Sequence, residues 1–229
     1  MTFISYAQNF EDVMLWRALQ HVEKGFYIDV GANDPMRDTV SRAFYELGWH
    51  GINIEPVDEW FSKLQTHRPR DVNLNVAASA EPGELVVYCV PGTGLSTMDE
   101  ETADRHRRER GYVPERLVVP ADTLANICAK YVESEIHFLK IDVEGSEQAV
   151  MAGMDFERFR PWIVVVEATV PNTRITNYQA WEPLLLAARY DLVYFDGLNR
   201  FYVAVEHREL KASFDTPPNV FDNFVQPAA

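Results

Sequence analysis

The sequence predicts an α/β fold in which helices cover a mostly parallel sheet. Short apolar runs that are typical of strands alternate along the chain with segments that carry apolar residues at helical spacing. The apolar runs are continuous instead of alternating with polar residues, which indicates strands buried on both faces. The chain has 229 residues, 47% of them hydrophobic, so we expect a single domain over residues 1–229 with a substantial core.

The first third of the chain predicts a helical leader followed by three strands. The leader covers residues 1–24 and is helical from about residue 9, because apolar side chains recur there on one face. Two helices connect the three strands, and Gly48 is a suitable C-terminal cap for the first of them. The predicted strands are 25–30, 51–56 and 72–78, and the predicted helices are 39–49 and 58–67.

The middle of the chain departs from this alternation. Two β-rich runs, 84–98 and 115–121, flank the polar and arginine-dense segment 101–116. We interpret residues 84–120 as a β-rich insertion. The arginine-dense segment is either a solvated helix or loop, or a lid whose guanidinium groups grip a phosphate or carboxylate of a substrate.

The last part of the chain returns to alternating helices and strands. A turn around Gly197 joins two final strands within residues 190–205. Prolines at 217, 218 and 227 indicate an irregular tail. The predicted helices are 122–131, 146–153 and 179–190, and the predicted strands before the final pair are 136–143 and 162–168.

The charge balance limits the class of partner. The formal net charge is −14 at pH 7, whereas nucleic-acid binding depends on clustered Lys and Arg. The same balance argues against binding to an anionic membrane surface. We therefore expect neither a nucleic acid nor a membrane as the partner.

Cysteine content and hydropathy indicate the compartment. Cys89 and Cys128 both lie in apolar runs, which is typical of reduced, buried cysteines. The N-terminus has no basic stretch followed by an apolar one, and no apolar run approaches 18 residues. These features predict a cytoplasmic protein without a membrane span.

Acidic residues follow four of the predicted strands. In an open α/β sheet, ligands bind outside the carboxyl ends of the strands, near the point where the strand order reverses. A carboxylate at the rim of a buried sheet needs a partner, so packing alone does not explain this set. The strand-end residues are Asp29, Gly31, Glu55, Pro56, Asp142, Glu144 and Glu167.

The spacing of these residues favours a nucleoside ligand that carries a positive charge. Glu55 lies 26 residues after Asp29, at the end of the next strand, where an acid can accept both ribose hydroxyls. The turn reads GAND and lacks the glycines that admit a pyrophosphate, while Asp29 and Asp34 would repel phosphate. S-adenosylmethionine has a ribose and a sulfonium but no phosphate. A nicotinamide-dependent oxidoreductase and a non-catalytic α/β module are the alternatives.

Five runs in order give the chain a resemblance to a known family. They are FYIDVGANDP, INIEPV, LNVAAS, FLKIDVEGSEQAVMAG and IVVVEA, and the leader SYAQNFEDVML is also similar. Over roughly residues 5–205 the chain resembles the FkbM family of S-adenosylmethionine-dependent methyltransferases. The resemblance implies a Rossmann-like class I methyltransferase fold, with helices on both faces of a seven-stranded, mostly parallel sheet whose last strand is antiparallel. It also implies O-methylation of a sugar or glycan in polysaccharide or glycoconjugate biosynthesis, or of a small secondary metabolite.

The resemblance also implies roles for individual residues. The acceptor would be a sugar or glycan, free, polymeric, lipid-linked or nucleotide-linked. Glu55, followed by Pro56, would hold the ribose, and Asp142 would lie near the sulfonium. Gln8 would close over the cofactor. The methionine moiety would be lined by Asp29, Gly31 and Asn33, and the adenine would contact Val76, Ala77 and Ala78.

Two mechanisms are compatible with the strand-end acids. In the first, Asp142 or Glu144 acts as general base on the acceptor hydroxyl, or Glu167 binds the acceptor directly. His137 is a weaker candidate, because it lies inside a strand where a buried histidine is more common. In the second, Asp142 and Glu167, with Asn172 nearby, bind Mg²⁺, which lowers the pKa of two vicinal hydroxyls.

Overall fold

A seven-stranded sheet forms the centre of the molecule. The structure is a computed structural model and describes residues 2–92, 96–170 and 173–227. The strand order is β11-β12-β10-β9-β2-β3-β4, and β12 runs antiparallel to both of its neighbours while the other strands share one direction. The predicted strand number and antiparallel last strand are therefore confirmed. The strands are β2 (Phe26–Val30), β3 (His50–Ile54), β4 (Val72–Leu74), β9 (Phe138–Ile141), β10 (Ile163–Glu167), β11 (Tyr190–Phe195) and β12 (Asn199–Ala204).

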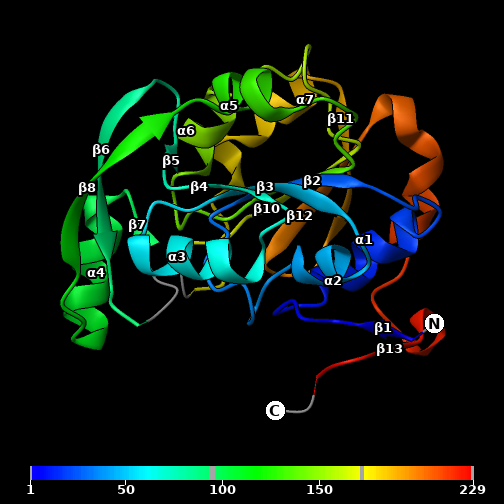
Figure 1. The fold of residues 1–229 in the computed structure, drawn as a ribbon, viewed down its shortest axis with the longest axis horizontal. Coiled ribbons are helices and arrows are strands. Elements are labelled where there is room, and N and C mark those ends of the chain that lie inside the picture. The colour runs from blue at the N-terminus through cyan, green and yellow to red at the C-terminus, as the bar shows by residue number, and fades with distance from the viewer. Residues whose placement is uncertain (1, 93–95, 171–172, 228–229) are drawn as a thin grey trace.

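Helices cover both faces of this sheet (Figure 1). One face carries α1 (Glu11–Leu19), α2 (Arg42–Glu46) and α3 (Asp58–His67), and the other carries α5 (Leu124–Tyr131), α6 (Glu147–Ala152) and α7 (Glu182–Ala187). A short 3₁₀ helix, η1 (Tyr178–Ala180), precedes α7. In the described part of the chain, no helix combines the length and the hydropathy needed to cross a bilayer. Both cysteines are free and buried, as predicted.

The strands are buried on both faces because apolar side chains alternate between two cores. On β2, Ile28 packs into the core beneath α5, α6 and α7, while Tyr27 packs into the core beneath α1 and α2. Every residue of β2 and of β10 is buried. The alternation fixes which strand-end side chains share a face, including those of Asp29 and Lys140.

The predicted strand 72–78 is wrong, because the chain leaves the central sheet in the middle of it. Strand β4 ends at Leu74, and β5 (Ala77–Ala78) belongs to a second sheet of order β5-β8-β6-β7. The side-chain amide of Asn75 donates to the carbonyls of Glu55 and Pro56 at 3.3 Å each, where the β3–β4 ladder would otherwise continue. The second sheet therefore begins directly beside the end of β3.

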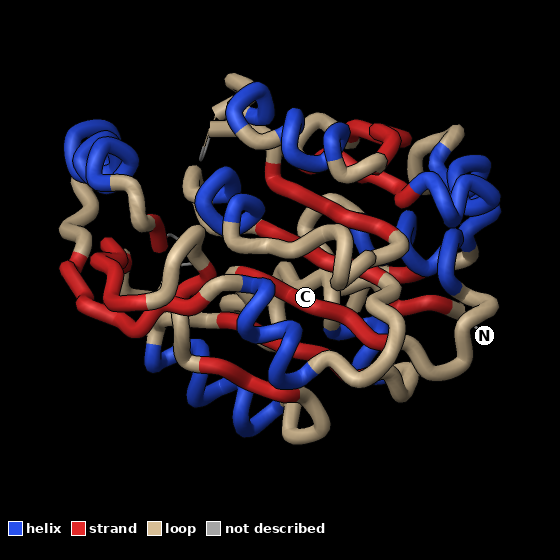
Figure 2. Tube along the Cα trace, turned by 90° about the horizontal axis from the view of Figure 1, so that it is seen from above, coloured by secondary structure: helices blue, strands red, loops and turns tan. Residues whose placement is uncertain are grey.

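The second sheet combines β5 with strands from the predicted β-rich insertion and lies at one end of the central sheet (Figures 1 and 2). The arginine-dense segment forms a helix that Asp99 caps by accepting from the Thr102 N–H at 2.9 Å. Its role as a lid stays a prediction. The elements are β6 (Gly83–Cys89), β7 (Ser96–Thr97), α4 (Glu100–Arg110) and β8 (Glu115–Asp122).

The tail is more regular than predicted. It forms two 3₁₀ helices, η2 (Val205–Phe214) and η3 (Val220–Asp222), and a short strand, β13 (Phe224–Val225). Strand β13 pairs in parallel with β1 (Phe3–Ile4), so the two ends of the chain lie side by side (Figure 1). Local sequence patterns do not reveal a pairing of two-residue strands that are more than 200 residues apart.

Candidate active site

A cavity of about 380 Å³ opens at the carboxyl ends of the central strands. It lies where β2 has β3 on one side and β9 on the other, which is the point at which the strand order reverses. Its volume is within the range of small-molecule binding sites. The residues predicted from sequence that line it are Gln8, Gly31, Asn33, Glu55, Pro56, Ala77, Ala78, Asp142, Glu144 and Glu167.

Three residues considered in the sequence analysis do not line the cavity. Asp29 is only 1% exposed and lies on the face of β2 that points toward α2, where Ser41 Oγ donates to it at 2.7 Å. Val76 packs against the apolar core. His137 is buried, and its Nδ1 accepts from the Phe26 N–H at 3.0 Å. Asp29 is thus placed beneath the cavity and not at its surface.

Lys140 connects the two strands at the cavity floor. Its Nζ lies 3.5 Å from Asp29 Oδ1 and 3.4 Å from Asp142 Oδ2, and it donates to the Gly31 carbonyl at 3.2 Å. Burial favours the neutral amine, but the carboxylates of Asp142 and Asp29 outweigh it and raise the pKa of Lys140. The contact of Lys140 with Asp142 follows from the i, i+2 spacing of the two residues, which places both side chains on one face.

Gly31 allows β2 and β9 to approach each other closely at this point. Its φ is +74°, and a Cβ built there would lie 1.9 Å from the backbone oxygen of Asp142. The Gly31 and Ala32 N–H groups both donate to the Ile54 carbonyl, at 3.0 and 3.3 Å, so the loop after β2 folds over the end of β3. The glycine is therefore required by the neighbouring strand as well as by the turn.

Glu55 joins the loop after β2 to the start of α3. Its two carboxylate oxygens accept from the Asn33 N–H at 2.9 Å and the Val57 N–H at 2.8 Å. Each oxygen keeps a second lone pair, and the side chain lines the cavity. Burial raises the pKa of Glu55 to about 7. A ligand that donates two hydroxyls would complete this carboxylate.

Glu144 and Glu167 form an acidic wall on the other side of β2. Burial and the charges of Asp142 and Glu147 raise the pKa of Glu144 to about 8. Burial and the charges of Asp142 and Glu144 raise the pKa of Glu167 well above its usual range. Glu144 sits at a left-handed φ of 54° in the loop before α6. Such crowding of carboxyl groups is typical of functional sites.

Four buried polar atoms around this cavity lack a hydrogen-bond partner. They belong to residues that line the cavity, and each atom is inaccessible to solvent. Buried polar groups in native proteins are nearly always satisfied, so we expect ordered water or a ligand to supply the missing partners at this cavity. The atoms are Asn33 Oδ1, Glu144 Oε2, Glu167 Oε2 and Thr169 Oγ1.

The structure adds lining residues that the sequence analysis did not assign to the site. Trp60 and Val87 give the β3 side of the cavity an apolar surface, whereas Thr169 and Thr173 extend the acidic side beyond β10. Thr169 lies two residues after Glu167, a spacing that could have revealed it. Other lining residues come from β7 and from loops distant in sequence: Asp38, Ser96, Thr97, Met98 and Leu198.

No metal centre is evident in the part of the chain that the structure describes. Within residues 2–92, 96–170 and 173–227 there is no group of three or more His, Cys, Asp or Glu side chains placed to hold an ion. Asn172, the third predicted ligand beside Asp142 and Glu167, lies outside the described residues. We therefore derive no step through Mg²⁺.

Fold and site together define an α/β protein with an acidic ligand cavity at the topological switch point. The chain belongs to the family of the methyltransferase FkbM domain, whose model matches residues 29–192. The resemblance identified from the sequence is thereby confirmed, and the protein is a methyltransferase.

Two further comparisons give less information. No curated protein matches the chain. Among solved structures, the chain is similar to a TehB-like SAM-dependent methyltransferase from Corynebacterium glutamicum. The two are 6% identical, the alignment covers 84% of this chain and 87% of the other, and the TM-score is 0.46.

The close approach at Gly31 can be tested against a matched glycine. We expect Gly31→Ala to lower the free energy of unfolding more than Gly48→Ala, because both glycines have positive φ but a Cβ at position 48 meets nothing within 4 Å. The control should cost about 1–2 kcal/mol, and overpacking should add roughly 1–3 kcal/mol at position 31. Urea unfolding measures both, and equal losses would contradict the steric argument.

The buried acids should make stability fall as pH rises towards and through neutral. Burial raises the pKa of Glu11, Glu55 and Glu147 to about 7 each. The folded state therefore binds more protons than the unfolded state from the unfolded pKa near 4 upward, so stability falls progressively with pH and levels off once pH has risen past the folded pKa values. We expect the melting temperature to be about 4–8 °C higher at pH 6.5 than at pH 8.5, equivalent to roughly 2 kcal/mol.

Calorimetry at several pH values measures this dependence directly. Glu147→Gln should reduce this dependence, since one of the buried carboxyl groups with a raised pKa no longer titrates. A melting temperature that rises between pH 6.5 and pH 8.5 would show that these carboxyl groups are ionised in the folded protein.

Proposed function

We propose that this protein is an S-adenosylmethionine-dependent O-methyltransferase with a Rossmann-like class I fold, and that its acceptor is a hydroxyl of a sugar or glycan. The observation that carries the proposal is the acidic cavity at the switch point with its four unpartnered polar atoms. Its acids favour a cationic nucleoside over a phosphate-bearing one. The family to which the chain belongs supports the methyl-transfer chemistry.

The lining of the cavity suits the different parts of the proposed cofactor. Glu55 has a free lone pair on each oxygen for the two ribose hydroxyls. Ala77, Trp60 and Val87 offer an apolar slot of the kind that an adenine ring fills. Asn33 Oδ1, which is buried without a partner, is free to accept from the ammonium group at the methionine end.

Asp29 has a different role from the one expected. It keeps Lys140 charged beneath the cavity, and Lys140 in turn orients Asp142 and the Gly31 carbonyl. We therefore assign Asp29 as a positioning residue for the proposed site, one layer behind the lining that Gly31 and Asp142 provide.

The bound cofactor would supply an electrophilic methyl group on a sulfonium. The residues of this chain then have two tasks: to align the acceptor oxygen with that methyl group and to remove the hydroxyl proton. Burial and the neighbouring carboxyl groups raise the pKa of Glu167 and so favour its protonated form, which can both donate to and accept from an acceptor hydroxyl. We assign proton removal to Glu144, whose pKa of about 8 is close to that of an effective base near neutral pH.

The charge of the cavity limits the acceptor. Asp38, Asp142, Glu144 and Glu167 line it, and the only lysine or arginine in the described lining is Lys140, which is already paired. An acceptor whose reacting sugar is neutral, or carries an amine, is therefore preferred over a uronate or a sugar phosphate. Any lipid or nucleotide attached to the acceptor would have to lie outside the cavity.

Cofactor binding can be tested without knowing the acceptor. We expect titration calorimetry to show binding of S-adenosylmethionine, weakened about tenfold or more in Glu55→Gln, since the amide nitrogen cannot accept a ribose hydroxyl. The matched control is Asp71→Asn, a buried acid that does not line the cavity. No binding by the unmutated protein would sink the proposal.

The catalytic assignment predicts a particular pH profile. The acceptor can be sought with a panel of neutral methyl hexosides, an amino sugar and a uronic acid, in which methylation is detected as a mass increase of one methyl group. We expect the neutral or amino sugars to be methylated. With such an acceptor, kcat/KM should rise with pH as Glu144 loses its proton, at a pH below about 8 because the bound cationic cofactor lowers this pKa. Glu144→Gln should lower methyl transfer about 10²–10⁴-fold with little change in cofactor affinity. Methylation of the uronic acid alone would contradict the charge argument.

A further inference from the structure

The wall that carries Gln8 comes from the leader of the chain. Gln8 lines the cavity together with Leu198, which belongs to the turn between β11 and β12. The two segments are connected next to the cavity, because Asn199 Nδ2 donates to Glu11 Oε1 at 2.7 Å and Asn9 Nδ2 donates to the Asp196 carbonyl at 3.4 Å. The position of Gln8 therefore depends on how the leader is held.

Asp12 gives the leader its shape. It is fully buried and accepts from Ser5 Oγ at 2.7 Å, from the Tyr6 N–H at 2.7 Å and from the Ala7 N–H at 3.2 Å. The Tyr6 carbonyl in turn accepts from the Thr39 N–H at 3.1 Å, in the loop after β2. The leader thus contacts the loop that carries Asn33 and Asp38 into the cavity.

The C-terminal segment fastens the start of the leader from outside. Strand β13 pairs with β1, and the Ser5 N–H donates to the Val225 carbonyl at 2.9 Å. The ring of Phe224 packs against Phe10 with centroids 5.2 Å apart. Phe10 itself has a left-handed φ of 62° immediately before α1, so this contact holds a backbone conformation that costs energy.

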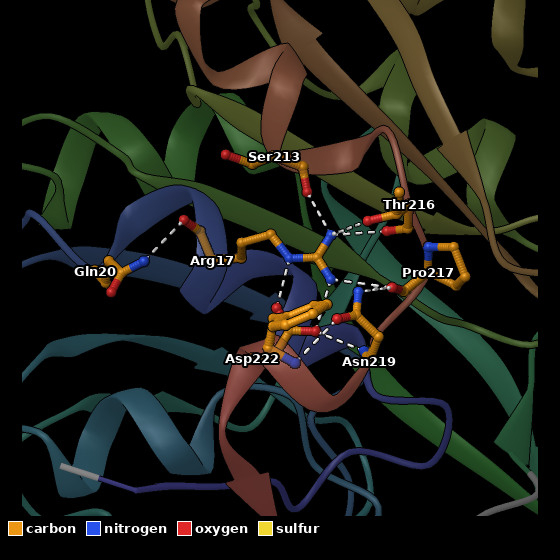
Figure 3. Close-up of polar contacts among 8 residues, drawn as sticks. Arg17, Gln20, Ser213, Thr216, Pro217, Asn219 and Asp222 are labelled. Carbon is orange, nitrogen blue, oxygen red and sulfur yellow. Dashed lines mark hydrogen bonds and ion pairs between the residues drawn. The ribbon is translucent and has the colours of Figure 1, made fainter.

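Arg17 on α1 holds this C-terminal segment in place (Figure 3). Its guanidinium forms a bidentate pair with Asp222, Nε to Oδ1 at 2.6 Å and Nη2 to Oδ2 at 2.7 Å. It also donates to the carbonyls of Ser213 at 2.8 Å, Thr216 at 2.7 Å and Pro217 at 3.1 Å. One side chain therefore fixes residues 213–222, the stretch that leads into β13.

Neither end belongs to the part of the chain that the family model matches, which is residues 29–192. We propose that the C-terminal segment 213–225 holds the leader over the cofactor cavity, so that Arg17 and Asp222 are positioning residues for Gln8 in cofactor binding. This inference rests on the proposed function for the identity of the ligand, S-adenosylmethionine. The contacts from Arg17 through β13 and β1 to Gln8 do not depend on it.

The experiment compares Arg17→Met with a matched arginine. Arg160 also joins separate segments, through the carbonyls of Ala188 and Phe156 and the carboxylate of Glu206. Arg160→Met should lower the melting temperature to a similar extent but leave the Kd for S-adenosylmethionine within about twofold. Arg17→Met should raise that Kd about tenfold, as Gln8→Ala should, because each removes the same contact.

Two readouts distinguish positioning from a general loss of stability. The double variant Gln8→Ala/Arg17→Met should bind no more weakly than either single variant, since the two changes act on one contact. Hydrogen exchange of the amides of residues 5–9 should quicken in Arg17→Met and not in Arg160→Met. Arg17→Lys keeps the positive charge but loses the bidentate geometry of the guanidinium. Its Kd and its exchange rates should therefore lie between those of the unmutated protein and those of Arg17→Met.

Failure of the positioning role and failure of the proposed function give different results. Additive losses in the double variant, or unchanged exchange of residues 5–9 in Arg17→Met, would overturn the positioning role. A failure of the unmutated protein to bind S-adenosylmethionine would overturn the proposed function instead. In that case the exchange comparison alone still decides whether the C-terminal segment holds the leader.

Discussion

The ammonium group of Lys140 makes the acidic cavity possible. It lies between Asp29 on β2 and Asp142 at the end of β9, and its bond to the Gly31 carbonyl fixes the same junction. Removing one partner of a buried ion pair typically costs about 3–5 kcal/mol, because the other charge is left without compensation. Without Lys140, Asp29 would be such a charge beneath a cavity that is already lined by five carboxyl groups.

A ligand can change the protonation state of the remaining carboxyl groups in the cavity. Burial raises the pKa of Glu55 to about 7 and that of Glu144 to about 8, so these groups are near their titration point at neutral pH. A cation entering the cavity favours the ionised form and lowers these pKa values. Binding of a positively charged ligand and proton release are therefore coupled here. Glu144 and Glu167 each keep one carboxylate oxygen without a hydrogen-bond partner, which such a ligand can use.

The sequence predicted the parts of the site that depend on strand ends, because the carboxyl ends of parallel strands meet at one edge. It placed Glu55, Asp142, Glu144 and Glu167 together for that reason. It misplaced Asp29 because only the position near the strand end was considered, and not the face of the sheet to which the side chain points. Asp29 shares the face of Tyr27, which packs beneath α1 and α2. Ser96 and Leu198 could not be predicted, since they reach the cavity through a second sheet and a distant turn.

The cavity wall thus has two physical origins, and they place different demands on the chain. The strand ends are fixed by the hydrogen-bonded sheet, and their geometry follows from the fold itself. The leader and the turn at Leu198 also depend on side-chain contacts between parts of the chain that are far apart, such as Glu11 with Asn199 and Arg17 with Asp222. Ordering such segments costs conformational entropy that each contact must offset. Charge-assisted and buried hydrogen bonds are the interactions strong enough to do so, which explains why acidic and basic residues hold the walls while apolar residues hold the sheet.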